Sequence, residues 1–436
     1  MTWSRYNSDM TTQTTPSQTV RSKFYQPLIS ALSVAQSNRQ CDQYPDLDFL
    51  KAGVGRVIEA STTGRAWVQY LQTVLQYAVS VRNFFAALKS KRRLELLQEI
   101  NQRIKDQVDH PDSHWEDPFA DIEELKGFQV YASDGHSHGA SCHDDQVYGK
   151  KRATTHIFSL NLRSHSLTHA ALTEPETGKK KEHEIHALKR IDGERLRYGA
   201  SKGVKVIHAY DPAVIDYRFW FKLKQCYGVY FITREKSNSS FLEMALPDWD
   251  PSDSRNIGVQ SVVGVSTSNG VMLRRMVYID PVTGTEFSFI TNEMTLPPGV
   301  ICMIYKRRWD IEKVFDEHKN KFSQKKAWGK SKTAKEQQAQ FIALAHNLLI
   351  LLERDLENEE GITDEKVKRK RASAMALSEL QAVKANRVPN PLVAQASRVT
   401  QRSLQFIRWL RWALTMNTPW TDAVENLRPL MQKYLL

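Results

Sequence analysis

Cysteine is scarce in this chain, and its four cysteines lie far apart, at Cys41, Cys142, Cys226 and Cys302. They show no CxxC spacing, so neither a disulfide framework nor a zinc ribbon is indicated. No apolar run approaches the roughly 20 residues that a membrane helix needs. The first 20 residues are polar and lack the apolar centre of a signal peptide. These absences predict a cytoplasmic protein with reduced thiols that does not engage a membrane.

Positively charged residues outnumber negatively charged ones. The 436 residues include 61 Lys and Arg against 49 Asp and Glu, which gives a net charge of +12. Such a surplus suits a polyanionic partner, but diffuse solubilising charge would give the same number. The composition is otherwise that of a folded chain with two or three domains, because 41% of the residues are hydrophobic and 25% are charged.

Helical and strand-like patterns divide the chain. Aromatic and aliphatic residues recur at helical spacing over 61–108, and prolines interrupt the pattern near 110–125. The next segment predicts the order β-β-β-α-β-α-β, which is typical of a mixed α/β layer. Its strands are expected at 128–133, 155–162, 166–172, 205–210 and 229–233, and its helices at 182–198 and 215–226.

A β-rich stretch over 237–298 follows. Asn269-Gly270 separates two strand-like runs and predicts a hairpin. Two long helices are expected after it, at 300–322 and 334–356. The last segment, 358–436, also has helical periodicity; it contains a basic run at 366–371 and three tryptophans expected in the core or at subunit contacts, Trp409, Trp412 and Trp420.

The segment YKRRWDIEKVFDEHK, residues 305–319, carries the clearest functional pattern. On a helix of about 3.6 residues per turn, four of its polar side chains share one stripe: Tyr305, Arg308, Glu312 and Lys319. Alone, this stripe also suits a solvated helix with i,i+4 pairs. Two more carboxylates, Asp134 and Asp211, stand at the ends of predicted strands, where an aspartate is also a common turn residue. Three carboxylates on adjacent elements of one sheet favour a site.

The positive charge is concentrated around the same segment. Residues 305–336 contain eleven Lys or Arg and five Asp or Glu, so 11 − 5 = +6, half of the surplus of the whole chain. This location favours DNA over diffuse solubilising charge.

The spacing Tyr-x2-Arg-x3-Glu-x6-Lys over 305–319 resembles the YREK signature of DDE transposases of the insertion-sequence-four type. Residues 128–145 resemble the segment that carries the first catalytic aspartate of that family, and 205–236 resemble the segment of the second. The resemblance implies an α/β fold: an RNase H-like mixed sheet flanked by helices, interrupted by a β-rich insertion, with helical N- and C-terminal regions.

The same resemblance implies a division of the chain into domains. The expected units are a helical DNA-end-binding domain at 1–125, a catalytic domain at 126–236 and 299–357, the insertion at 237–298 and a helical C-terminal region at 358–436.

Clustered carboxylates repel one another and provide the oxygen ligands that hard divalent ions prefer. We therefore expect Asp134, Asp211 and Glu312 to be catalytic and to hold two Mg²⁺ or Mn²⁺ ions per active site. Asp134 would bridge the ions. After Asp211 the chain departs from the family pattern, and Asp216 stays as the weaker candidate for the second aspartate.

The remaining side chains of the signature are expected to contact DNA. Arg308 and Lys319 would hold phosphates, Tyr305 would donate its hydroxyl to one, and Trp309 would either stack on a displaced base or lie in the core. A second group, HxHx3CH, is formed by His136, His138, Cys142 and His143. Zinc is one interpretation of this group; a place at the rim of the metal site, facing DNA, is the other.

The function implied is that of an insertion-sequence transposase, which cleaves DNA at terminal inverted repeats and transfers the strand into target DNA. It would act in the bacterial cytoplasm at the nucleoid, as a homodimer on DNA. Two alternatives stay open: a non-transposing nuclease of the same fold, and a domesticated DNA-binding protein without catalysis.

Overall fold

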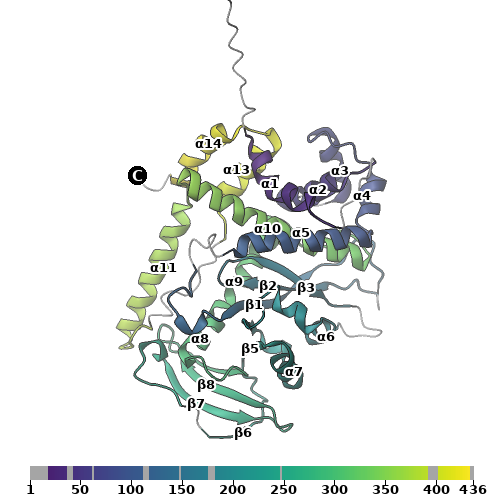
Figure 1. Cartoon of the computed structure of the whole chain (residues 1–436). Coiled ribbons are helices and arrows are strands. Elements are labelled where there is room, and N and C mark those ends of the chain that lie inside the picture. The colour runs from purple at the N-terminus through teal and green to yellow at the C-terminus, as the bar shows by residue number, and fades with distance from the viewer. Residues whose placement is uncertain are drawn as a thin grey trace, which may run out of the picture.

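The computed structural model describes residues 18–36, 43–60, 63–110, 117–146, 149–174, 182–245, 248–390 and 401–432. Its centre is a nine-stranded sheet of order β3-β2-β1-β4-β5-β9-β8-β7-β6 (Figure 1). The strands are β1 (Phe128–His138), β2 (Thr154–Asn161), β3 (Leu167–Leu172), β4 (Lys205–Tyr210), β5 (Val229–Arg234), β6 (Leu242–Glu243), β7 (Val259–Ser266), β8 (Met272–Ile279) and β9 (Glu286–Thr291). The predicted class, a mixed α/β sheet flanked by helices, is confirmed.

The antiparallel and parallel parts of the sheet meet at β1. This strand pairs antiparallel with β2 and parallel with β4, and β4 pairs parallel with β5. Parallel neighbours need crossover connections. The crossover into β4 contains α6 (Glu184–Lys189) and the 3₁₀ helix η3 (Gly193–Arg197), two short pieces in place of the one helix expected at 182–198. The crossover into β5 contains α7 (Tyr217–Tyr227).

The β-rich stretch extends the same sheet. Strand β9 pairs antiparallel with β5, and β8, β7 and β6 follow it outward. The predicted hairpin at Asn269-Gly270 is confirmed, since it joins the antiparallel strands β7 and β8. Gly270 has a φ of 75°, a value that glycine adopts without the steric cost of a side chain.

Five helices are described before β1: α1 (Val20–Ser33), α2 (Asp46–Ile58), α3 (Gly64–Thr73), α4 (Val81–Ala87) and α5 (Lys91–Asp109). The last three fall where helical periodicity is read from the sequence. The first two are not predicted, because Pro27 lies inside α1 and Gly53 and Gly55 lie inside α2, and these residues disfavour helices. Tertiary packing overrides that preference.

The packing partner is α10 (Lys332–Glu360), which runs with α5 across one face of the sheet, while α6 and α7 lie on the other (Figure 1). Ser331 caps α10, and most side chains between Gln337 and Ile350 are buried. A Cβ at Gly53 would lie 2.1 Å from the ring of Phe341, so the approach of α2 to α10 requires glycine. Helices α1, α2, α5 and α10 share one hydrophobic core with β1 and β2.

The expected single helix at 300–322 is wrong. The chain forms α8 (Pro298–Arg307), then α9 (Trp309–Asp316), then a π-helical turn, η6 (Glu317–Lys321). At the first break the amide of Arg308 donates to the carbonyl of Tyr305, a tighter i→i−3 bond. The break matters because Arg308 is the residue at this joint, and Glu312 lies after it on α9.

The C-terminal region contains α11 (Glu365–Lys384), α13 (Leu404–Met416) and α14 (Trp420–Gln432). Trp409 and Trp420 are buried, as a place in the core requires, whereas Trp412 is 42% exposed. The run at 366–371 lies in α11. Across the described segments, no helix combines the length and the apolar character needed to cross a membrane.

Candidate active site at the ends of β1 and β4

Asp134 and Asp211 lie side by side because their strands are parallel neighbours. Ser133 of β1 is in register with Tyr210, the last residue of β4, and an aspartate follows each of them. The amide of Ala213 donates to Oδ1 of Asp211 at 2.9 Å and so begins the short helix η4 (Pro212–Val214). The sheet thus places Asp211 just after the end of β4 and Asp134 beside it on β1. The prediction that Asp134 ends its strand is wrong, because β1 continues to His138.

Glu312 reaches the two aspartates through Arg308. Nη1 of Arg308 lies 2.8 Å from Oδ2 of Asp134, and Nη2 lies 3.0 Å from Oε1 of Glu312. Only 5% of the surface of Arg308 is exposed. The other oxygen of Asp134, Oδ1, accepts the amide of Gly135 at 2.8 Å. One buried guanidinium therefore holds together carboxylates from β1 and α9.

The charges of this group act on one another. Burial raises the pKa of Asp134; Arg308 and the Gly135 amide oppose that shift, and the charges of Asp211 and Glu312 add to it. Burial lowers the pKa of Arg308, but Tyr305 and the three carboxylates together outweigh burial and raise it. The three carboxylates thus form one electrostatic unit with Arg308 at its centre.

The joint between α8 and α9 is fixed by a second ion pair. Nη2 of Arg307 lies 3.1 Å from Oδ2 of Asp310, and both side chains are fully buried. The guanidinium of Arg307 also lies over the ring of Phe119, 5.4 Å from its centroid. Because Arg307 and Asp310 point into the protein, Arg308 is turned toward the carboxylates.

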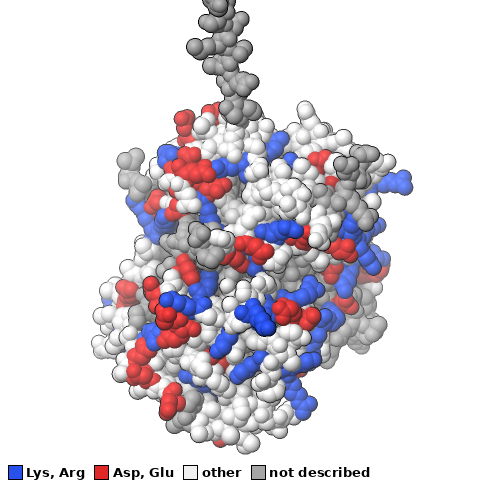
Figure 2. Space-filling view, in the orientation of Figure 1, with Lys and Arg blue, Asp and Glu red and all other residues white. Residues whose placement is uncertain are grey.

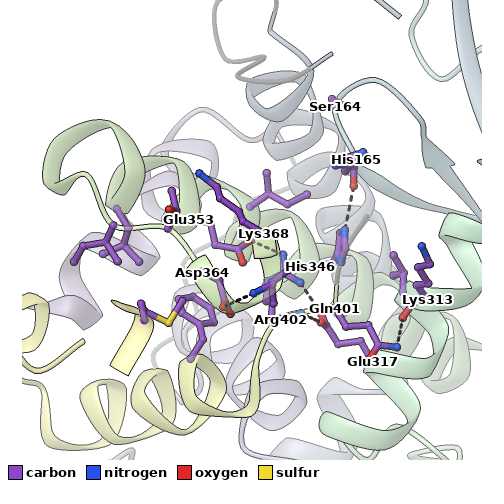
Figure 3. A pocket seen from close by; sticks show the side chains of 18 of the residues that line it. Ser164, His165, Lys313, Glu317, His346, Glu353, Asp364, Lys368, Gln401 and Arg402 are labelled. Carbon is purple, nitrogen blue, oxygen red and sulfur yellow. Dashed lines mark hydrogen bonds and ion pairs between the residues drawn. The ribbon is translucent and has the colours of Figure 1, made fainter. Parts of the chain in front are cut away.

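The far side of α9 borders a cavity of about 170 Å³ (Figure 3). In it Arg402 bonds Glu317 of η6 at 2.6 Å and Glu353 of α10 at 2.9 Å. Gln401 donates to the carbonyl of Lys313 at 3.2 Å. The C-terminal region thereby holds the end of α9 and the π-helical turn against α10.

The other members of the signature differ in their exposure and in their contact with the guanidinium of Arg308. The ring centroid of Tyr305, which is buried, lies 5.7 Å from the guanidinium of Arg308, and burial raises the pKa of its hydroxyl to about 12. Trp309 is 58% exposed, and its ring centroid lies 5.6 Å from the same guanidinium. Lys319 is exposed on η6. The π-helical turn takes Lys319 off the regular stripe.

The histidines do not lie where the sequence places them. His136 and His138 are buried on β1, and burial lowers the pKa of His136 to about 4 and that of His138 to about 3. The ring of His136 stacks on Phe315, 4.7 Å between centroids. Cys142 and His143 are exposed on the following loop. The expectation that these histidines face DNA or the rim of the metal site is therefore wrong for His138, which is fully buried.

Asp216 has a different environment from Asp211. Its Oδ1 accepts the amide of Phe219 at 3.0 Å and caps α7, and its Oδ2 pairs with Lys189. Burial opposes ionisation, but the contacts with Lys189 and the helix amides outweigh it and lower the pKa of Asp216. These contacts give Asp216 a structural role at the start of α7.

Metal binding can be judged from the donor set. Within the described ranges, no three His, Cys, Asp or Glu side chains are spaced as a preformed metal site, and this holds for HxHx3CH as well. For the carboxylates the cause is visible, since Arg308 takes one oxygen of Asp134 and one of Glu312. The chemistry nevertheless fits: Asp134, Asp211 and Glu312 supply only oxygen, and their negative charges reinforce one another, which suits a hard divalent cation.

Taken together, the site is a cluster of acidic residues on two adjacent strands of a mixed α/β sheet, with a helix that brings in the third carboxylate and a cation. The model of the family described as Transposase DDE domain matches residues 149–348. This match supports a DDE transposase and an RNase H-like fold for the sheet. It covers Asp211 and Glu312 and begins 15 residues after Asp134. No curated protein matches the chain.

Sequence reasoning missed the residues that hold the site in place. Arg307 and Asp310 stand within the signature segment, and their i,i+3 spacing was a signal for a pair. Arg402 had no comparable signal, because it lies 85 positions after Glu317. Such long-range pairs depend on the fold.

Proposed function

We propose that this chain is the transposase of an insertion sequence of the insertion-sequence-four type, and that it cleaves the terminal inverted repeats and joins the ends to target DNA. One observation carries the proposal: a single buried guanidinium, Arg308, joins Asp134 to Glu312 beside Asp211. Two of the three carboxylates lie within the residues that match the transposase DDE domain.

In this proposal Asp134, Asp211 and Glu312 would hold two Mg²⁺ or Mn²⁺ ions. Bound ions would lower the pKa of water and neutralise the charge that develops on the leaving oxygen. The chain's own contribution is position: β1 and β4 fix the two aspartates in register, and α9 brings Glu312 toward them. Asp211 is favoured over Asp216, whose oxygens cap α7 and pair with Lys189.

Four residues of the signature would bind the DNA. Arg308 and Lys319 would contact phosphates beside the scissile bond, and Tyr305 would support Arg308 and donate to a phosphate. The exposure of Trp309 supports stacking on a displaced base rather than a place in the core. Its ring also lies against Arg308, so base and phosphate contacts would come from one place.

Basic side chains continue from the signature along the end of β1. The amide of Gly139 donates to the carbonyl of Lys325 at 2.8 Å, which places Lys325 and Lys326 beside this strand. Lys319, Lys325 and Lys326 are exposed. We call these three residues the lysine rim. Figure 2 shows Lys and Arg interspersed with Asp and Glu over the face it draws, so charge there does not form one continuous basic surface.

We further propose that the rim guides DNA away from the cutting site. The domain roles given by the resemblance fit this path: residues 1–125 would bind the DNA ends, 126–236 and 299–357 would cut, and 237–298 would be the insertion. The region 358–436 supports the proposal through Arg402, which holds the end of α9. Coordinated cutting of two ends calls for a homodimer on the DNA.

The proposal is tested by incubating the protein and Mg²⁺ with DNA that carries the inverted repeats bracketing its gene. A transposase gives cleavage at the ends and joining to a second DNA. Cleavage without joining would indicate a non-transposing nuclease, and binding alone a domesticated DNA-binding protein.

Glu312→Gln and Asp134→Asn are expected to abolish cleavage while DNA binding is kept. Glu286→Gln is the matched control, since Glu286 is exposed on β9. Unchanged cleavage by Glu312→Gln would show that the metal site is assigned incorrectly.

A further inference from the structure

Arg308 lies at the position from which a cation would balance the carboxylates. It bonds Asp134 at 2.8 Å and Glu312 at 3.0 Å, and Asp211 follows the strand that pairs with β1. A divalent ion bound by the same three residues would lie close to this positive charge and would be repelled by it. Guanidinium and metal ion are therefore alternatives for one place.

Asp134 is the residue on which this competition is sharpest. Its Oδ1 accepts the amide of Gly135 and its Oδ2 accepts Nη1 of Arg308, so each oxygen already has a donor. A carboxylate oxygen can accept more than one contact, but an ion held by Asp134 would lie beside the guanidinium, so Arg308 weakens metal binding for as long as it keeps this bond.

An alternative position for the Arg308 guanidinium lies toward solvent. Its guanidinium lies near the rings of both Tyr305 and Trp309, 5.7 and 5.6 Å from their centroids. Trp309 is 58% exposed and marks the way to solvent. A guanidinium binds phosphate with two parallel hydrogen bonds, as it binds a carboxylate. A DNA phosphate placed over Trp309 would compete for Arg308 while the contact to the indole ring is kept.

We propose that Arg308 is an exchangeable cation that couples DNA binding to metal binding. In the free protein it occupies the carboxylates and weakens metal binding; a DNA phosphate draws it away and opens them to the ion. This rests on the proposed function and adds a form of regulation to it: the carboxylates bind the metal ions tightly only when DNA is present. By linkage, metal must tighten DNA binding by the same factor.

The test measures Mn²⁺ affinity by calorimetry in the free protein and in its complex with a DNA duplex that ends at the cleavage position of a bracketing repeat, in a 3′-deoxynucleotide, so that neither cleavage nor joining can occur. DNA should tighten Mn²⁺ binding by wild-type protein by about tenfold, within the usual range of coupling between sites. Arg308→Gln should bind Mn²⁺ about tenfold more tightly than wild type without DNA, and DNA should add little.

Lys319→Gln is the matched control, since it removes one positive charge near the site but no bond to a carboxylate; it should change Mn²⁺ affinity far less. If Arg308→Gln does not fold, Mn²⁺ affinity is measured in Arg308→Lys instead. The comparison of wild-type protein with and without DNA does not depend on any variant.

Equal Mn²⁺ affinity with and without DNA, together with no gain in the Arg308 variants, would overturn the coupling and leave the proposed function intact if Glu312→Gln still loses the ion. No Mn²⁺ binding by any of these proteins would instead remove the metal site and the proposed function with it.

Discussion

Arg402 and Glu317 form an ion pair that is almost completely shielded from water. Nη1 of Arg402 lies 2.6 Å from Oε1 of Glu317, and the two residues are 8% and 2% exposed. Glu353 accepts a second bond at 2.9 Å. Breaking one partner of a buried pair leaves an uncompensated charge, which costs far more than the pair itself contributes.

Arg402→Met is therefore expected to lower the free energy of unfolding by about 3–5 kcal/mol, as measured by urea denaturation. Lys332→Met is the control, because Lys332 pairs with Glu174 at the surface and both side chains are about half exposed. That change should cost about 1 kcal/mol or less. Similar losses in the two variants would show that burial of the Arg402 pair carries no special weight.

Asp211 and Asp216 can be separated by comparing stability with activity. Asp216→Asn removes the ion pair with Lys189 and weakens the cap of α7, so we expect a loss of about 1 kcal/mol in unfolding free energy and little change in cleavage per folded molecule. Asp211→Asn should abolish cleavage with a smaller effect on stability. The reverse pattern in paired denaturation and cleavage assays would make Asp216 the second aspartate.

Several buried histidines make stability depend on pH. Burial lowers the pKa of His138, His169 and His346 to about 3 in each case. Two nearby cations act in the same direction: Arg195 lowers the pKa of His169, and Arg402 lowers that of His346. Protonating these imidazoles in acid therefore places a charge inside the folded protein.

The sign follows from which state takes up protons. The unfolded chain binds protons near pH 6.5 and the folded chain only near pH 3, so stability is complete above pH 6.5 and falls below it. Each of His138, His169 and His346 should contribute a loss of about 1.4 kcal/mol between pH 7.5 and 5.5, about 4 kcal/mol for the three. Urea denaturation at both pH values measures it. His169→Gln should reduce the loss by about 1.4 kcal/mol, and an unchanged pH dependence would contradict this account.

The sheet was accessible from the sequence because strand signals are local. Strand β4 coincides with the predicted range 205–210, and the aspartate that follows it was identified there. The bond between Arg308 and Asp134 was not accessible, because the two residues are 174 positions apart in the chain. Helical periodicity also did not show that Trp309 is exposed. Contacts between distant segments decide such side chains.

Buried histidines show the same limit. The HxH spacing on β1 alternates with small residues, a pattern that suits either a metal ligand or a core strand. What decides for the core is that α9 packs on β1, with Phe315 stacked on His136. The sequence thus identified the carboxylates, but it could not tell which polar neighbours would face them.

The lysine rim makes a prediction about salt. Each Lys that contacts a phosphate releases a counterion, so the slope of log K against log salt concentration falls by about one unit when it is removed. Lys325→Ala with Lys326→Ala should therefore weaken binding to a duplex and reduce the slope by about two units, and Lys319→Ala by about one. Lys330→Ala with Lys332→Ala is the matched control from the same stretch of chain, because these lysines pair with Asp145 and Glu174. If the two double variants reduce the slope by the same amount, DNA does not follow the end of β1.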